Sequence, residues 1–179
     1  MEDEILKRLH RIYKRASEDF GNENCYLTGS MAVYFLGKTL NINVSGVMPN
    51  DVDILVHTKE SFRNSVRGQP PQRSITYNKG TVDEYDIIGT YRKISGIKVN
   101  SRLGKKTLCI YVQKPELIKD EYEDQKEDTN DPLKMVKINR NIKILEQIQS
   151  RMIDKFEEVE TKQDNRQRRK DTVSRKLKF

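Results

Sequence analysis

A short apolar run that passes directly into a helical pattern through Gly29-Ser30 constrains the fold of this chain more than any other feature. Residues 25–28 are apolar enough to predict a strand, and residues 31–40 carry apolar side chains at helical spacing. After a loop at 41–50, the run 51–56 alternates between two faces and predicts a second strand. This order predicts an α/β or α+β domain in which helices flank a mixed β-sheet.

The rest of the chain supplies further helices and strands in the same way. An amphipathic helix is expected at 2–20, a short helix at 58–67, strands at 74–77, 85–91, 97–103 and 107–112, a short helix from Pro115, and a long helix at about 132–159. The apolar spacing of the long helix fits a core-facing helix and a coiled-coil seam equally. We favour the first, because the pattern lasts for only about three heptads.

The charge of the 179 residues is distributed unevenly. The net charge is +7, and the segment 162–179 alone contributes +6, from eight basic and two acidic residues. The segment 116–131 has the opposite composition, with a net charge of −6. We therefore predict one domain at 1–161, containing an acidic connection at 116–131, and a basic, disordered tail at 162–179 that either binds nucleic-acid phosphates or only solubilises the protein.

Composition excludes several classes of protein. Hydrophobic residues make up 35% of the chain, and no stretch approaches the ~18 apolar residues of a membrane span. Neither a membrane-spanning protein nor a cleaved signal peptide is expected. The two cysteines, Cys25 and Cys109, fall in predicted strands, where we expect them to be reduced and buried in an intracellular protein, cytoplasmic or located in a nucleus or virus particle.

The residues that indicate chemistry are a pair of aspartates and the glycine-serine turn. Asp51 and Asp53 are two positions apart on a predicted strand, so their carboxylates share a face and lie about 6–7 Å apart along the chain. A divalent ion such as Mg²⁺ relieves their repulsion, while Gly29 and Ser30 open a helix whose free N–H groups suit a phosphate. The simpler alternatives are a turn or capping role for Asp51, an ion pair for Asp53 and an N-cap role for Ser30.

These motifs resemble those of the DNA-polymerase-β-like nucleotidyltransferase superfamily. The matching residues are 27–30 (LTGS) and 51–55 (DVDIL), and 110–118 (IYVQKPELI) is similar to the segment that follows the third acid of the family. The resemblance covers about residues 24–145 and is greatest to small stand-alone members from abortive-infection toxins and large DNA viruses. It implies a nucleotidyltransferase-like fold, an NTP substrate, and Mg²⁺ or Mn²⁺ bound by Asp51 and Asp53.

The chain departs from the family pattern in two places. Ser30 and Asp51 are 21 positions apart, a longer interval than is usual in the family. Asn100 stands where the resemblance places the third catalytic carboxylate, and Asp86 is the fallback candidate. An amide oxygen can bind a metal ion but cannot accept the proton of an attacking hydroxyl, so Asn100 in that position implies weak or absent catalysis.

Three functions remain open at this point. The first is transfer of an NMP group from an NTP to a hydroxyl of a nucleic acid, a protein or a small molecule. The second is a nucleotidyltransferase-fold protein that has lost catalysis and serves as a binding or structural component, with the long C-terminal helix as a surface for a protein partner. The third is a general nucleic-acid-binding domain that depends on the tail 162–179.

Overall fold

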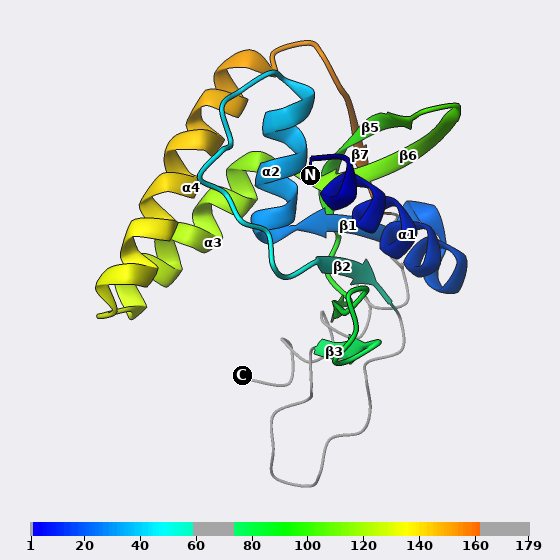
Figure 1. Cartoon of the computed structure of the whole chain (residues 1–179), viewed down its shortest axis with the longest axis horizontal. Coiled ribbons are helices and arrows are strands. Elements are labelled where there is room, and N and C mark those ends of the chain that lie inside the picture. The colour runs from blue at the N-terminus through cyan, green and yellow to red at the C-terminus, as the bar shows by residue number, and fades with distance from the viewer. Residues whose placement is uncertain (1, 59–73, 162–179) are drawn as a thin grey trace, which may run out of the picture.

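The computed structural model of the chain describes residues 2–58 and 74–161 (Figure 1). It is a mixed α/β structure with a seven-stranded sheet and four α-helices. The helices are α1 (Glu2–Phe20), α2 (Gly29–Thr39), α3 (Pro115–Asp128) and α4 (Pro132–Arg151). The strands are β1 (Cys25–Thr28), β2 (Asp53–His57), β3 (Ser74–Tyr77), β4 (Tyr85–Thr90), β5 (Ser95–Leu103), β6 (Lys106–Gln113) and β7 (Glu157–Glu160). Except for residue 58, the expected helix at 58–67 lies outside the described residues. The tail 162–179 lies entirely outside them.

The sheet has the strand order β3-β4-β2-β1-β6-β5-β7 and is mixed, as the sequence predicts. Strand β1 pairs antiparallel with β2 and parallel with β6, while β2 pairs parallel with β4. The predicted alternation of β2 is confirmed, because Ile54 and Val56 are fully buried while Asp53, Leu55 and His57 are half-buried. The half-buried face of β2 is therefore the one on which a site can open.

Helices cover the sheet and enclose the core. In α1, the spacing of Leu9, Ile12, Tyr13 and Ala16 places all four in the core, against strand residues. Helix α2 is buried along most of its length, and α3 and α4 lie side by side with α2 next to α4 (Figure 1). None of the described helices is both long and apolar enough to cross a membrane.

The region after β6 differs from the sequence-based prediction. Helix α3 continues to Asp128, so the acidic segment is largely helical rather than a connection, and most of its charged residues are exposed along that helix. Helix α4 ends at Arg151 instead of near residue 159. Its side chains from Ile138 to Ile148 supply buried residues, which supports the core-facing interpretation over the coiled-coil one.

The predicted extension of α4 fails because the chain turns back to the sheet. Asp154 has a positive φ of 62°, and the next segment forms β7, which pairs antiparallel with β5. Ion pairs join this strand to the protein, with Lys93 Nζ 2.6 Å from Glu160 and Lys114 Nζ 3.2 Å from Glu158. Phe156 packs against the core even though it lies beyond the end of α4. The helical spacing of apolar residues therefore extends past the helix itself.

The two cysteines are both free. Cys25 is buried as expected, and burial raises the pKa of its thiol to about 12. Cys109 is only half-buried, contrary to the expectation, because the side chains of β6 near its hairpin end are only partly covered.

Candidate functional site

Four strand ends meet at one edge of the sheet, and they carry the residues predicted from the sequence. Thr28, the last residue of β1, lies opposite Asp53, the first residue of β2. Asp53 is in turn opposite Asp86 near the start of β4. The parallel pairing of β1 with β6 brings Gln113, at the end of β6, to the same edge. The register therefore collects a glycine-serine turn and several acids in one place.

A cavity of about 240 Å³ opens at this edge. Its lining includes Gly29, Ser30, Asp51 and Asp53, so the structure brings these four predicted residues together. Helix α3 closes the other side with residues that the sequence analysis did not assign to the site, namely Ile118, Glu121, Tyr122 and Gln125. Their spacing of three and four positions is a helical face, but nothing in the sequence indicates what that face covers.

Of the two candidates for the third acid, the fallback candidate Asp86 is the one beside Asp53, although it does not line the cavity. The two residues are register partners on adjacent parallel strands, and Thr76 on β3 donates a 2.6 Å hydrogen bond to Asp86 Oδ1. Asn100 lies elsewhere. It is exposed on β5 opposite Cys109, three strands from β2 and about four residues back from the site edge, which amounts to more than 10 Å in each direction. The structure does not bring Asn100 to the site.

Negative charge dominates the surroundings of Asp53. The pKa of its carboxyl is raised to about 6, mainly by burial and then by the charges of Asp86, Asp51 and Glu121, in that order. Partial desolvation also raises the pKa of Glu121, and burial together with the Asp53 charge raises that of Tyr122. Among the described residues, none of the charges acting on Asp53 is positive, so no ion pair within this part of the chain explains the aspartate.

The turn between β1 and α2 is built for close approach. Gly29 has a φ of +67°, and a Cβ added there would lie 2.8 Å from Oδ2 of Asp53. Ser30 is in the first helical turn rather than at the N-cap, which is Thr28. The Thr28 hydroxyl does not cap the helix but donates a 2.6 Å hydrogen bond to Gln113 Oε1. The first N–H groups of α2 thus have no side-chain cap and no acidic neighbour in their turn.

Hydrogen bonds connect this turn to helix α3, which forms the opposite wall of the cavity. Gln113 Nε2 donates to Glu121 Oε1 at 3.3 Å, so a chain of contacts runs from Thr28 through Gln113 to Glu121. Asn141 of α4 donates to the hydroxyl oxygen of Tyr122 at 3.1 Å. That hydroxyl accepts from Asn141 and keeps its own hydrogen, which can be donated to a ligand in the cavity.

Arg8 of α1 links the segments that precede the acids. Its Nη2 donates to the carbonyl of Asn50 at 3.0 Å and to the carbonyl of Glu84 at 3.2 Å. Asn50 directly precedes Asp51, and Glu84 lies two residues before Asp86. Arg8 thereby fixes the starts of β2 and β4 relative to each other without touching the carboxylates.

We expect Arg8→Ala to loosen this edge of the sheet and to lower the free energy of unfolding by about 1–3 kcal/mol, because two carbonyls lose a charged donor. Exchange of the Asp86 amide, which donates to the Val52 carbonyl at 2.9 Å, should become faster. Hydrogen-exchange NMR measures this. Arg11→Ala is the matched control, since it breaks only a surface ion pair with Asp83; equal exchange rates in both variants would argue against a linking role for Arg8.

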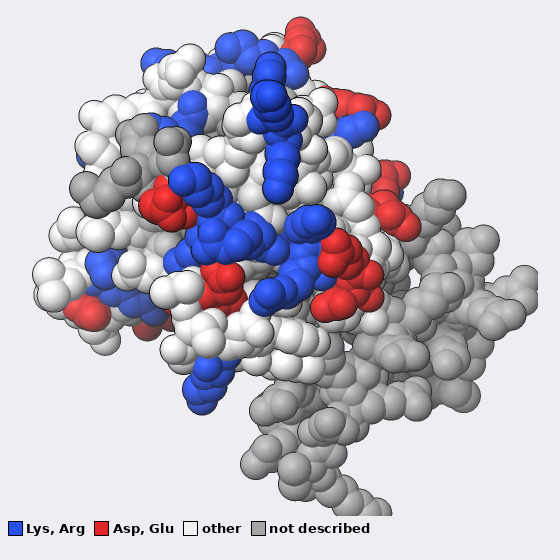
Figure 2. Space-filling model, turned by 45° about the vertical axis from the view of Figure 1, so that its right-hand side comes forward, with Lys and Arg blue, Asp and Glu red and all other residues white. Residues whose placement is uncertain are grey.

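The face on which α1 lies carries a group of basic side chains bordered by acidic ones (Figure 2). Figure 2 shows Lys and Arg side chains gathered across it with Asp and Glu directly beside them. Two of these contacts are defined, with Arg11 Nη2 2.8 Å from Asp83 and Lys7 Nζ 2.9 Å from Glu4. This mixture is typical of a solvated surface and gives no support to a nucleic-acid site there.

Comparisons with family models, with curated proteins and with solved structures found no match to this chain.

Proposed function

We propose that the protein is a nucleotidyltransferase that moves an NMP group from an NTP to a hydroxyl acceptor. The observation that carries the proposal is that Asp51 and Asp53 line one cavity with the Gly29-Ser30 turn, while Asp86 is the register partner of Asp53 on the adjacent strand β4. This is the arrangement that a nucleotidyltransferase-like fold requires. The motif order and the family resemblance point to the same activity.

The donor set around Asp53 fits a hard divalent cation. Four carboxylates lie near one another, and no positive charge from residues 2–58 or 74–161 acts on Asp53. Within the described ranges, no three His, Cys, Asp or Glu side chains already have metal-coordinating geometry. Asp51 and Asp53 would hold Mg²⁺ or Mn²⁺, which, when bound, neutralises charge on the phosphates.

The residues of the chain account for the other needs of the reaction. The uncapped N–H groups at the start of α2 suit the phosphates of the NTP, and Gly29 lets them approach Asp53. The acceptor oxygen forms a bond to the α-phosphorus, and the bond from that phosphorus to the bridging oxygen breaks. Pyrophosphate leaves with the electron pair, while Asp86 takes the proton of the acceptor hydroxyl.

The placement of Asp86 weighs against the alternative of a binding protein that has lost catalysis. That alternative depended on Asn100 occupying the place of the third acid. With Asp86 beside Asp53, a carboxylate is available as the base. Catalysis therefore needs nothing from β5.

We expect Asp86→Asn to reduce nucleotide transfer by about a hundredfold or more, the usual contribution of a general base. Transfer of label from α-³²P-NTPs, assayed with Mg²⁺ and Mn²⁺ against nucleic-acid, protein and small-molecule acceptors, measures this. Asn100→Ala is the control and should retain activity. The opposite ranking of the two variants would restore Asn100 as the third site residue, and no transfer by the unmodified protein with any acceptor would favour the binding role.

A further inference from the structure

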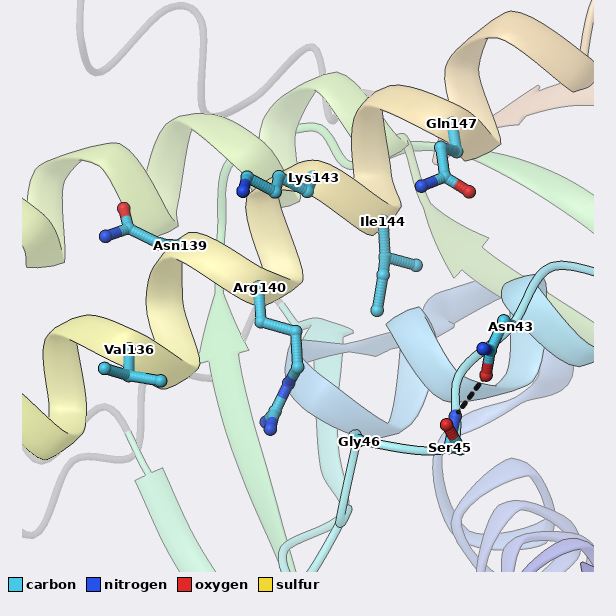
Figure 3. A pocket seen from close by; sticks show the side chains of 9 residues that line it. All are labelled: Asn43, Ser45, Gly46, Val136, Asn139, Arg140, Lys143, Ile144 and Gln147. Carbon is cyan, nitrogen blue, oxygen red and sulfur yellow. Dashed lines mark hydrogen bonds between the residues drawn. The ribbon is translucent and has the colours of Figure 1, made fainter.

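A second and larger cavity lies away from the carboxylates, between α4 and the loop that follows α2. Its volume is about 540 Å³, within the range of small-ligand sites, and it shares no lining residue with the cavity at Asp53. Figure 3 shows the α4 side chains on one side of the space and the segment from Asn43 to Gly46 on the other. Nothing in the sequence motifs accounts for this cavity.

Arg140 is the residue that most needs an explanation here. Figure 3 shows its side chain reaching from α4 toward Gly46, and a Cβ added to Gly46 would lie 3.1 Å from Arg140 Cδ. The Nε atom is buried without a hydrogen-bond partner, and the guanidinium forms no hydrogen bond or ion pair with any residue in the described parts of the chain. A buried donor left unpaired costs about 1–3 kcal/mol, so an unpaired arginine over a cavity is a candidate ligand contact.

The lining has the chemistry of an anion site. Lys143 is the second cation, and no Asp or Glu is among the lining residues. Neutral hydrogen-bonding groups come from Asn139, Gln147 and Ser45, while Ile144 and Val136 add apolar surface. Two positive charges without an acidic partner favour a group that carries more than one negative charge.

We propose that this cavity binds the phosphate group of a phosphorylated ligand, with Arg140 and Lys143 as its cationic contacts. The planar fork of arginine donates hydrogen bonds to two phosphate oxygens at once, and the lysine ammonium adds a point charge. The phosphate belongs either to a free nucleotide-sized molecule or to a nucleic-acid strand. The cavity volume and the apolar surface of Val136 accommodate part of the ligand beyond its phosphate group.

The cavity adjoins the carboxylate site through α4. Asn141, the neighbour of Arg140 in sequence, donates its hydrogen bond to Tyr122, which lines the cavity at Asp53. A ligand held by Arg140 would therefore lie beside the wall of the proposed catalytic site. The phosphate site itself does not rest on the proposed activity, and its test uses no divalent ion.

The experiment measures binding by the full chain in EDTA, where the carboxylates hold no metal ion. The probes are AMP and a 5′-phosphorylated eight-residue oligothymidylate, with adenosine as the phosphate-free comparison. Isothermal titration calorimetry should detect binding of at least one phosphorylated probe but not of adenosine. Arg140→Ala should weaken that binding by roughly tenfold or more, the usual effect of losing a charged hydrogen-bond donor.

Lys137→Ala is the control, because it removes the same charge from an exposed position of the same helix outside the lining. Lys143→Glu paired with Lys137→Glu repeats the test at two exposed positions where folding is not at risk. Binding of AMP identifies a small phosphorylated ligand, and binding of the oligothymidylate alone identifies a strand. Two results would overturn the proposal. The first is equal affinity of the cavity and control variants, as expected if the basic tail binds the strand. The second is no binding of either probe at about 1 mM.

Discussion

Asp53→Asn is expected to abolish nucleotide transfer and at the same time to stabilise the protein at pH 8. The folded-state pKa of about 6 lies roughly two units above the ordinary value of 3.8, so ionising Asp53 in the fold costs about 3 kcal/mol. The amide has nearly the same shape and carries no charge. Thermal unfolding should shift upward by roughly 6–12 °C, measured by calorimetry without divalent ions.

The direction of the stability change in Asp53→Asn follows from the pH range over which Asp53 ionises. Because the pKa of Asp53 is higher in the folded state than in the unfolded state, Asp53 costs almost no stability below about pH 3, where both states are protonated. The cost develops as pH rises from about 3 through about 6 and is complete above that. The variant should therefore gain stability at pH 8 and almost none at pH 3; an equal gain at both pH values would contradict the electrostatic explanation.

The same titration limits activity at low pH. A protonated Asp53 cannot hold a divalent ion, so transfer by the unmodified protein should fall below about pH 6. Stability and activity of this group thus change in opposite directions over one pH interval. A carboxylate retained at a cost to the fold is the pattern expected of a functional residue.

Gly29→Ala is expected to remove activity by displacing Asp53, with only a modest loss of stability. The added methyl group would lie 2.8 Å from Asp53 Oδ2, closer than the two atoms can approach, so the carboxylate must move. The carboxylate is the end of a side chain and can rotate away, so most of the stability cost comes from the positive φ of 67° and amounts to about 1 kcal/mol.

Gly104→Ala provides the matched control for this prediction. Gly104 has a similar φ of +58°, and a Cβ there would meet nothing within 4 Å. Both variants should lose about 1 kcal/mol in chemical denaturation, while only Gly29→Ala should lose transfer, by about a hundredfold or more. If Gly29→Ala kept full activity with unchanged folding, Asp53 would not need its present position.

The local elements of this fold could be predicted well from the sequence. Helix α1, the turn after β1 and the alternation of β2 depend on side-chain period and on glycine, which act over a few residues. The same local reasoning failed at α4. Met152 and Phe156 continue the helical spacing, yet they pack on the core from a turn, because β7 gains hydrogen bonds and ion pairs along β5 that no local pattern reveals.

Only the part of the candidate site that depends on local sequence could be predicted as well. Gly29, Ser30, Asp51 and Asp53 could be identified as a site because each pair is close in sequence and follows or begins a strand. The choice between Asp86 and Asn100 could not be made, since it depends on which strand pairs with β2. Glu121 and Tyr122 reach the site only through the docking of α3, which is a long-range contact.

By itself the sequence determined the mixed α/β class, the glycine-serine turn and the paired aspartates, because side-chain period and backbone permissiveness are properties of neighbouring residues. Only the tertiary structure decided that β4 lies beside β2, which brings Asp86 next to Asp53, and that Arg140 faces a second cavity without a partner in the described parts of the chain. Strand order and helix docking join residues far apart in the chain, and their energies arise from packing and pairing that exist only once the chain has folded.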